Sequence, residues 1–364
     1  MRWLSRSWAA AQAVVTALFL AALGLGGLEL LARAWPDDPP APRATADAFQ
    51  GQPDAEATLD VVYSGQLQTR FAPFVHFTLA PHDGPLIEID AEGRRRVPGT
   101  ATSTRAPTVW MFGGSTMWGM GARDEGTIPA HLTRLLGHEV RVVNFGQVGY
   151  LSTQEVLTLL LELQAGRRPD VAVFYDGVNE VFPALKLGQA GLPLDVARRR
   201  AEFNITRPDA LPRLTGAALT GLVRSSRLLR RFVPAPAPSP AAMPPEAGAA
   251  AVLEVYGANV RAARALGEAF GFETLFFWQP TVFTKARRSP DETRWAEAEA
   301  GYAPLYAATR ARLGAVGPEY VVDLSEVFGD DPRPAFFDFC HVAEAGNAVI
   351  AAALLPHVRA ALQR

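Results

Sequence analysis

From residue 107 onward, short apolar segments alternate with longer stretches of helical pattern. Five segments have the length and composition of buried strands, and they are 108–114, 140–146, 170–177, 273–280 and 320–328. Helices are predicted between and after them, near 126–137, 152–166, 250–271, 291–314 and 342–362. Apolar strands separated by helices are typical of a parallel sheet covered on both faces. The pattern therefore predicts an α/β fold that binds its ligand at the carboxyl ends of the strands.

The first predicted strand ends in the sequence GGSTMWGMG, where Ser115 follows two glycines. A phosphate-binding loop would need a lysine after its second glycine, but Met120 and Gly121 follow Gly119. The stretch also lacks the G-x-G-x-x-G of dinucleotide-binding folds, and Met117 stands where G-x-S-x-G requires its last glycine. Taken alone, the stretch fits a strand-to-helix turn with Ser115 as a cap.

A serine nucleophile needs a base, a group that orients the base, and donors for the developing oxyanion. Of the six histidines, His341 lies where a loop enters the last predicted helix. Asp338 precedes it by three residues, so its carboxylate can fold back onto Nδ1 and leave Nε2 free to face a serine. Taken alone, His341 fits a helix cap or a surface histidine equally well.

Two further loops follow predicted strands at the same edge of the sheet. The loop NFGQVGY (144–150) contains Gly149, whose backbone N–H is not blocked by a side chain. The loop YDGVNEV (175–181) contains Asn179, whose amide can donate to an oxyanion. Each loop by itself also fits an ordinary turn. The ordered appearance of all these residues is much harder to explain by coincidence than any one of them.

This ordered set resembles the SGNH, or GDSL-like, hydrolase family, which is named for motif blocks bearing Ser, Gly, Asn and His. The matching positions are Ser115, Gly149, Asn179, and His341 with Asp338. The match spans residues 107–182 and 250–364. The sequence departs from the family pattern at Gly114, where the usual G-D-S has aspartate, and at Glu180, where aspartate usually follows the asparagine.

The resemblance implies a flavodoxin-like, three-layer α/β/α fold with a five-stranded parallel sheet in the order 2-1-3-4-5. It also implies that Ser115 attacks an ester carbonyl, while His341, oriented by Asp338, acts as general base and then as general acid. The backbone N–H groups of Ser115 and Gly149 and the side chain of Asn179 would form the oxyanion hole. The resemblance implies no metal and no organic cofactor.

The N-terminal region predicts a membrane anchor. Residues 7–28 contain no charged side chain and are long enough to cross a bilayer. Arg2 and Arg6 precede this run, which predicts that residues 1–6 are cytoplasmic and the remainder lies outside. We therefore expect a single transmembrane anchor at 7–33 in the inner (cytoplasmic) membrane, with the catalytic domain on the periplasmic side. A cleaved signal peptide is the alternative.

The rest of the chain divides by composition. We predict a linker at 34–58, a small β-rich flap at 59–105, a hydrolase core at 106–182 and 250–364, and an inserted basic, Pro-rich segment at 183–249. Within the insertion, residues 219–232 fit a short basic amphipathic helix. Such a helix either is solvated or contacts anionic lipid headgroups.

Charge and cysteine content narrow the functional classes. The formal net charge of -2 gives no indication of a nucleic-acid partner. The single cysteine, Cys340, excludes an intrachain disulfide, and we expect it to be a packing residue rather than a catalytic thiol. Together with the predicted anchor, the resemblance to SGNH hydrolases implies an extracytoplasmic serine esterase for O-acyl esters, with O-acetyl groups on a glycan as the expected substrate. The alternatives are an acyltransferase that uses the same acyl-enzyme and a non-catalytic binding module. The acyl chain, the acceptor and the oligomeric state do not follow from the sequence.

Overall fold

The computed structural model describes residues 15–17, 19–20, 23–24, 26–31, 46–203, 243–317 and 319–364. The chain divides into two compact units, one of residues 1–41 with 195–238 and the other of residues 42–194 with 239–364. The second unit holds every residue that the sequence singles out for catalysis.

The second unit is built on a parallel sheet of five strands. These are β5 (Thr108–Gly113), β6 (Arg141–Asn144), β7 (Val171–Asp176), β8 (Glu273–Trp278) and β9 (Val321–Asp323). Their spatial order is β6-β5-β7-β8-β9, which is the expected order 2-1-3-4-5. In this topology the chain changes direction across the sheet between β5 and β7, so a ligand is expected at the carboxyl ends of these two strands.

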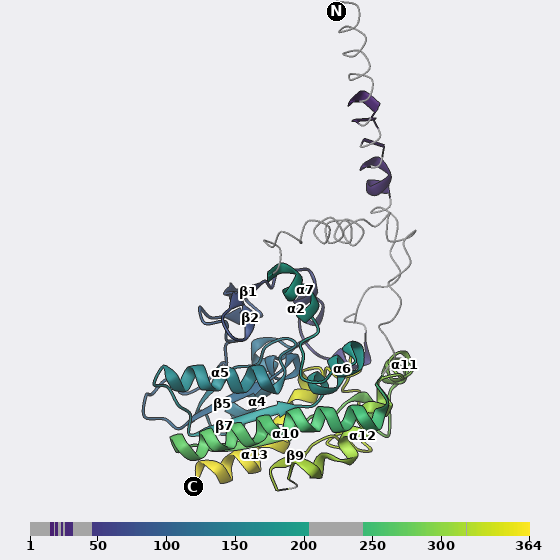
Figure 1. Ribbon diagram of the computed structural model, residues 1–364. Helices are drawn as coiled ribbons and strands as arrows, with labels where there is room; N and C mark the ends of the chain where they lie inside the picture. Colours follow the sequence, from purple (N-terminus) through teal and green to yellow (C-terminus); the bar gives the residue numbers. More distant parts are fainter. Residues whose placement is uncertain are drawn as a thin grey trace, which may run out of the picture. The chain divides into compact units, whose positions relative to one another are not determined.

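Helices cover both faces of the sheet. They are α3 (Ser115–Trp118), α4 (Ile128–Leu135), α5 (Ser152–Gln164), α6 (Val178–Leu187), α10 (Pro245–Phe270), α11 (Pro290–Ala298), α12 (Ala303–Ala311) and α13 (Glu344–Leu362). Short 3-10 helices are η1 (Asp47–Phe49), η2 (Asp124–Gly126), η4 (Val282–Thr284) and η5 (Leu313–Val316). Helix α10 contacts α5, α6 and α12, and it runs along the sheet in Figure 1, whereas α13 contacts α4.

The side chains of β5 alternate between these two helical layers. Trp110 and Phe112 belong to the core beneath α10, whereas Val109 and Met111 belong to the core beneath α4 and α13. Phe112 also stacks on Phe174 of the neighbouring strand, with ring centroids 4.9 Å apart. Because both faces are buried, the strand has an unbroken apolar sequence rather than an alternating one.

The segment predicted as a flap, 59–105, contains short strands and begins inside a helix. Its elements are α2 (Ala55–Tyr63), the antiparallel hairpin of β1 (Thr69–Ala72) and β2 (His76–Leu79), and the short pair β3 (His82–Asp83) and β4 (Glu88–Ile89). An antiparallel bridge pairs Arg95 with Asn144 at the end of β6. The flap is therefore joined to the edge of the central sheet.

The linker predicted at 34–58 is wrong in its second half, where η1 precedes α2. Phe49 and Ala55 are only 3% and 8% exposed, and they pack in one cluster with Phe337. The Pro, Ala and Asp content suggested a tether, but these apolar side chains bury themselves against the core. Residues 34–45 lie outside the described residues.

One predicted helix is in fact two. The segment 291–314 contains α11 and α12 with a turn between them, followed by η5. Pro304 lies in the first turn of α12, where its missing N–H costs no hydrogen bond, whereas within a continuous helix it would break one.

The insertion predicted at 183–249 is shorter at both ends. Helix α6 continues to Leu187, and α10 already begins at Pro245. Between them, α7 (Val196–Phe203) belongs to the other unit. Residues 204–242, with the basic helix predicted at 219–232, lie outside the described residues.

Much of the anchor predicted at 7–33 also lies outside the described residues. Those that are described, between 15 and 31, are helical, and large apolar side chains such as Phe19 and Leu30 are 62% and 70% exposed. Elsewhere in the described chain, α13 has the length and hydropathy of a membrane span. It is a core helix instead, since Ile350, Leu354 and other side chains pack against the sheet.

Candidate active site

Ser115 is the first residue of α3, the one-turn helix that follows β5 directly. The preceding Gly114 has an extended backbone, with φ -80° and ψ -150°. The N–H of Ser115 lies at the first helical position, where an α-helix offers no carbonyl partner. The serine is 8% exposed. The strand-to-helix turn therefore places the nearly buried hydroxyl of Ser115 at the carboxyl end of β5. The backbone N–H of the same residue lies there too, and it has no carbonyl partner within the helix.

His341 and Asp338 meet this serine across 226 residues of sequence. The Oγ atom of Ser115 lies 2.7 Å from Nε2 of His341, and Nδ1 of His341 lies 2.6 Å from Oδ2 of Asp338. Because the carboxylate can only accept, Nδ1 carries the ring proton, and Nε2 accepts from the serine hydroxyl. The three side chains form one hydrogen-bonded chain in the order that nucleophilic catalysis requires.

The turn that holds Asp338 and His341 is closed by its own backbone. The N–H of Phe337 donates to the carbonyl of His341 at 3.1 Å. The Oδ1 atom of Asp338 accepts from the N–H groups of Cys340 at 2.9 Å and His341 at 2.7 Å. Asp338 thus uses one oxygen to shape the turn and the other to orient the imidazole.

The environment favours charge on Asp338 and a neutral thiol on Cys340. Burial acts to raise the pKa of Asp338, but the charge of His341 and the hydrogen bonds from His341 and Cys340 hold it below its usual value. Burial, followed by the charge of Asp338, raises the pKa of the Cys340 thiol well above its usual range. A protonated thiol is a poor nucleophile, and Cys340 is 4% exposed and lies in the core cluster beneath α10, as expected of a packing residue.

Asn179 lies directly beside the nucleophile turn. Its Nδ2 donates to the carbonyl of Tyr150 at 2.7 Å. Tyr150 follows Gly149, whose φ of +80° is a conformation that glycine adopts without strain. An amide carries two N–H groups, so this bond fixes Asn179 and leaves one N–H for another acceptor. Both oxyanion candidates are therefore joined at the same turn.

The close approach of Asn179 also explains Gly114. A Cβ atom added at Gly114 would lie 2.0 Å from Nδ2 of Asn179. An aspartate at this position, as in the usual G-D-S, cannot fit while Asn179 holds its present place. The departure from the family pattern is thus the condition for the observed position of the amide.

The second departure from the motif pattern is Glu180, which stands where aspartate usually follows the asparagine. Its Oε2 accepts from the N–H of Gly177 at 2.9 Å, and its Oε1 accepts from the N–H of Ser152 at 2.8 Å. The first bond caps α6 at its N-terminal end, and the second joins α6 to α5. The carboxylate therefore fixes the helical turn that presents Asn179.

Replacing Gly114 with alanine is expected to displace Asn179 and to lower kcat for ester hydrolysis by about 10²–10³-fold, the usual cost of one oxyanion donor. KM should change little, because the donor acts on the transition state. Asn179→Ala should give a similar loss, and the double variant should lose no more than Asn179→Ala alone. The exposed Gly301, where an added Cβ meets nothing within 4 Å, provides the control Gly301→Ala. Additive losses in steady-state kinetics would contradict this explanation.

A buried ion pair supports the segment before the catalytic turn. Nζ of Lys285 lies 2.7 Å from both carboxylate oxygens of Glu292 and donates to the carbonyl of Arg333 at 2.6 Å. Oε1 of Glu292 also accepts from the N–H groups of Ala335 and Phe336, at 2.9 and 3.1 Å. Both charged side chains are fully buried, and together they fix the chain two residues ahead of Asp338.

The segment predicted as linker contributes an aromatic support for the base. The ring of Phe49 lies 4.8 Å from that of Phe337, and Phe337 stacks on the imidazole of His341 at 5.8 Å with an interplanar angle of 16°. The imidazole plane is therefore held by packing as well as by Asp338.

Gln52 in the same segment joins the two halves of the site. Its Nε2 donates to the carbonyl of Gly121 at 2.8 Å, and its Oε1 accepts from the N–H of Glu344 at 3.0 Å. Gly121 follows the nucleophile helix, and Glu344 begins the helix after His341. A chain shortened to begin at residue 59 would lose this bridge and Phe49.

Sequence reasoning did not find Phe49, Gln52, Lys285 or Glu292. Phe49 is a large apolar residue in a segment read as a tether, and this mismatch was the available signal. Lys285 and Glu292 carry no signal, because their spacing matches no motif and charged residues are usually exposed.

One group of described residues has the atoms to hold a metal ion. Ligand atoms of Asp338, Cys340 and His341 lie within 4.8 Å of one another. The Asp338 oxygens already accept from the ring and N–H of His341 and from the N–H of Cys340. A cation here would break the bonds that orient the imidazole, so the arrangement suits proton transfer better than metal binding.

Comparison with known proteins gives matches among solved structures. A carbohydrate acetylesterase family member from Sinorhizobium meliloti is 17% identical, with a TM-score of 0.37, covering 71% of this chain and 100% of its own. An acetyl xylan esterase is 15% identical, with a TM-score of 0.40, covering 69% of this chain and 99% of its own. A member of the lipolytic protein G-D-S-L family from Veillonella parvula DSM 2008 is 11% identical, with a TM-score of 0.38, covering 69% and 97%. No protein-family model and no curated protein matches the sequence.

Proposed function

We propose that this protein is a serine esterase that hydrolyses O-acyl esters, with O-acetyl groups of a glycan as its substrate class. The observation that carries the proposal is the chain from Ser115 Oγ to His341 and on to Asp338, at 2.7 and 2.6 Å. A nucleophile bonded to a base that a carboxylate orients is the arrangement for acyl transfer. The motif resemblance to SGNH hydrolases supports an ester as the group attacked.

The residues suggest the following steps. Ser115 Oγ attacks the ester carbonyl as its proton moves to Nε2 of His341, and the carbonyl oxygen becomes an oxyanion held by the N–H groups of Ser115 and Gly149 and the amide of Asn179. The intermediate then expels the alcohol oxygen, which takes the proton from His341. Water next attacks the acyl-enzyme and gives its proton to His341, and the released serine recovers that proton as the carboxylic acid leaves.

The same acyl-enzyme would support transfer to a sugar hydroxyl in place of water. The experiment therefore uses the full chain in detergent with an aryl acetate, with and without an oligosaccharide acceptor. Phenol release that depends on Ser115, with free acetate as the main product, is the expected result. If an acetylated oligosaccharide were the main product, the protein would be an acyltransferase and not an esterase. No cleavage above the level of Ser115→Ala, with aryl acetate or butyrate, would refute both and favour a binding module.

We propose further that the catalytic unit lies on the periplasmic side of the inner membrane, anchored by residues 7–33. The support is the uncharged run at 7–28 with Arg2 and Arg6 before it. The full chain should sediment with membranes and resist extraction at high pH, whereas a chain without residues 1–33 should not. Recovery of the full chain in the soluble fraction would refute the anchor.

A further inference from the structure

The helix that carries Ser115 is too short to be stable by itself. It has four residues, Ser115–Trp118, whereas isolated helices need about 12–15 residues to be even marginally stable. The last four carbonyls of an α-helix have no hydrogen-bond partner inside the helix. Because α3 is so short, nearly all of its carbonyls belong to this group. The direction of the Ser115 side chain therefore depends on groups outside α3.

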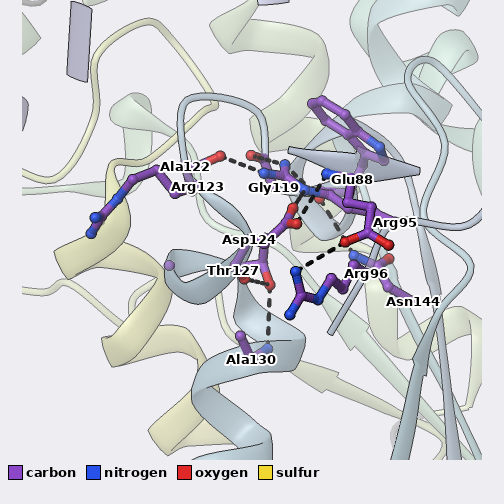
Figure 2. Close-up of polar contacts among 12 residues, drawn as sticks. Glu88, Arg95, Arg96, Gly119, Ala122, Arg123, Asp124, Thr127, Ala130 and Asn144 are labelled. Atoms are coloured by element: carbon purple, nitrogen blue, oxygen red, sulfur yellow. Dashed lines mark hydrogen bonds and ion pairs between the residues drawn. The ribbon is translucent and has the colours of Figure 1, made fainter. Parts of the chain in front are cut away.

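Arg95 of the flap binds the last carbonyl of α3 and two carbonyls of the turn that follows it. Its Nη1 donates to the carbonyls of Trp118 at 3.2 Å and Gly119 at 2.8 Å, and its Nη2 donates to the carbonyl of Ala122 at 2.6 Å. Its Nε donates to Oδ1 of Asp124 at 2.8 Å. Figure 2 shows this network around Arg95 and Asp124. These bonds use four of the five N–H donors of the guanidinium.

The network is closed to water. The Arg95 side chain has 0% exposure and lies over the Trp118 ring, with Cζ 4.4 Å from the ring centroid. Asp124 is 4% exposed, and its Oδ2 accepts from the N–H of Glu88 in β4 at 3.0 Å. Burial raises the pKa of Asp124, and the charge and hydrogen bond of Arg95 oppose the rise. The two charges are thus matched inside the protein.

The edge of the central sheet completes the arrangement. Asn144 at the end of β6 donates through Nδ2 to the carbonyls of Met117 at 3.2 Å and Trp118 at 3.4 Å. The backbone of Arg95 pairs with Asn144 in the antiparallel bridge. The sheet edge therefore holds the end of α3 directly through Asn144, and it also places Arg95 beside the same helix end.

We infer that Arg95 is a positioning residue for the nucleophile: by binding the carbonyls of Trp118, Gly119 and Ala122, it fixes the helix that Ser115 begins. The inference rests on the proposed function. Arg95 is hydrogen-bonded to neither Ser115 nor His341, so it acts on Ser115 through α3 and the turn after it, by its bonds to backbone carbonyls and its contact with the Trp118 ring. A lysine has one nitrogen in place of the planar guanidinium and cannot reach all of these acceptors together.

The test compares Arg95→Lys with Arg96→Lys in the full chain. Arg96 is the neighbouring residue, and its exposed side chain pairs with Glu88 at 2.9 Å outside the buried network (Figure 2). Two quantities are measured well below each variant's unfolding temperature. The first is the rate at which a fluorophosphonate modifies Ser115 per folded molecule. The second is the effect on kcat and on KM, each determined separately, for hydrolysis of an aryl acetate.

Arg95→Lys should lower both the fluorophosphonate rate and kcat by about 10–100-fold, the cost of a small misplacement of reacting groups. KM should stay close to that of the wild type, and Arg96→Lys should match the wild type in every respect. A general loss of folded protein would lower the amount of active enzyme but not the rate per folded molecule.

If Arg95→Lys does not fold, Asp124→Asn takes its place. It keeps an oxygen for Arg95 but removes the opposite charge, so the rate per folded molecule should again fall with KM unchanged. A folded Arg95→Lys or Asp124→Asn that reacts as fast as wild type would overturn the inference alone. A wild-type chain whose Ser115 does not react would refute the proposed function and the inference with it.

Discussion

Ser115→Ala is expected to lower kcat for an aryl acetate by about 10⁶-fold, the usual result of removing the nucleophile of such a triad. His341→Ala should give a loss of similar size, because the hydroxyl 2.7 Å from its Nε2 then has no base. The double variant should be no slower than either single variant, since the two side chains act as one unit. Steady-state rates and fluorophosphonate labelling measure both effects.

The controls are a serine and a histidine outside the site. Ser103 is exposed, and His138 is exposed with φ +62° in a turn, a conformation that asparagine accepts. Ser103→Ala and His138→Asn should keep wild-type kcat and labelling. Hydrolysis by Ser115→Ala at more than about one thousandth of the wild-type rate would show that another group attacks the ester.

Asp338→Asn is expected to lower kcat by about 10⁴-fold while leaving the fold in place. An asparagine can donate from its amide to Nδ1 of His341, which would move the ring proton to Nε2. In that tautomer the imidazole cannot accept the proton of Ser115. Asp331→Asn is the control, because Asp331 pairs with Arg333 at the surface. A loss in Asp338→Asn smaller than about tenfold would refute the orienting role of the carboxylate.

The same variant gives a pH dependence of stability. The pKa of Asp338 is lowered in the folded chain, so the unfolded state binds this proton more readily. The stabilisation from the charged carboxylate is complete above the unfolded pKa of about 4 and is lost as the pH falls through the lower folded value. The difference in unfolding free energy between wild type and Asp338→Asn should therefore shrink in urea titrations below about pH 4. A difference that grows with acidity would contradict the assigned direction.

Much of the fold could be predicted because its signal is local. The apolar runs of β5 and β7 follow from burial on both faces, and the order of the five strands follows from the family resemblance. The boundaries were less accurate, since α11 and α12 were taken as one helix despite Pro304. The second half of the predicted linker was misjudged for a different reason. A few apolar residues such as Phe49 in a Pro-rich stretch do not reveal what they pack against.

The candidate site could be predicted in its members but not in its support. Ser115, Asn179 and His341 were proposed because each follows a strand or precedes a helix in a short motif, and the structure places Ser115 and His341 in hydrogen-bond contact. Arg95 and Gln52 lie in segments without such a motif. Their side chains bind backbone carbonyl and N–H groups of the turn around Ser115 and of α13. A sequence does not reveal which side chain reaches a given backbone group.

The sequence by itself determined the α/β core, the serine at the end of the first core strand, and the Asp338–His341 pair, because strand and turn formation depend on neighbours along the chain. Only the tertiary structure decided that His341 Nε2 lies 2.7 Å from Ser115 Oγ. It also decided that Gly114 leaves room for the amide of Asn179 and that Arg95 of the flap donates to the carbonyls of Trp118 and Gly119, at the end of the helix that Ser115 begins. These contacts join residues that lie far apart in the chain. They form only when the sheet and its helices have packed together, because that packing brings each buried polar group within reach of its hydrogen-bond partner.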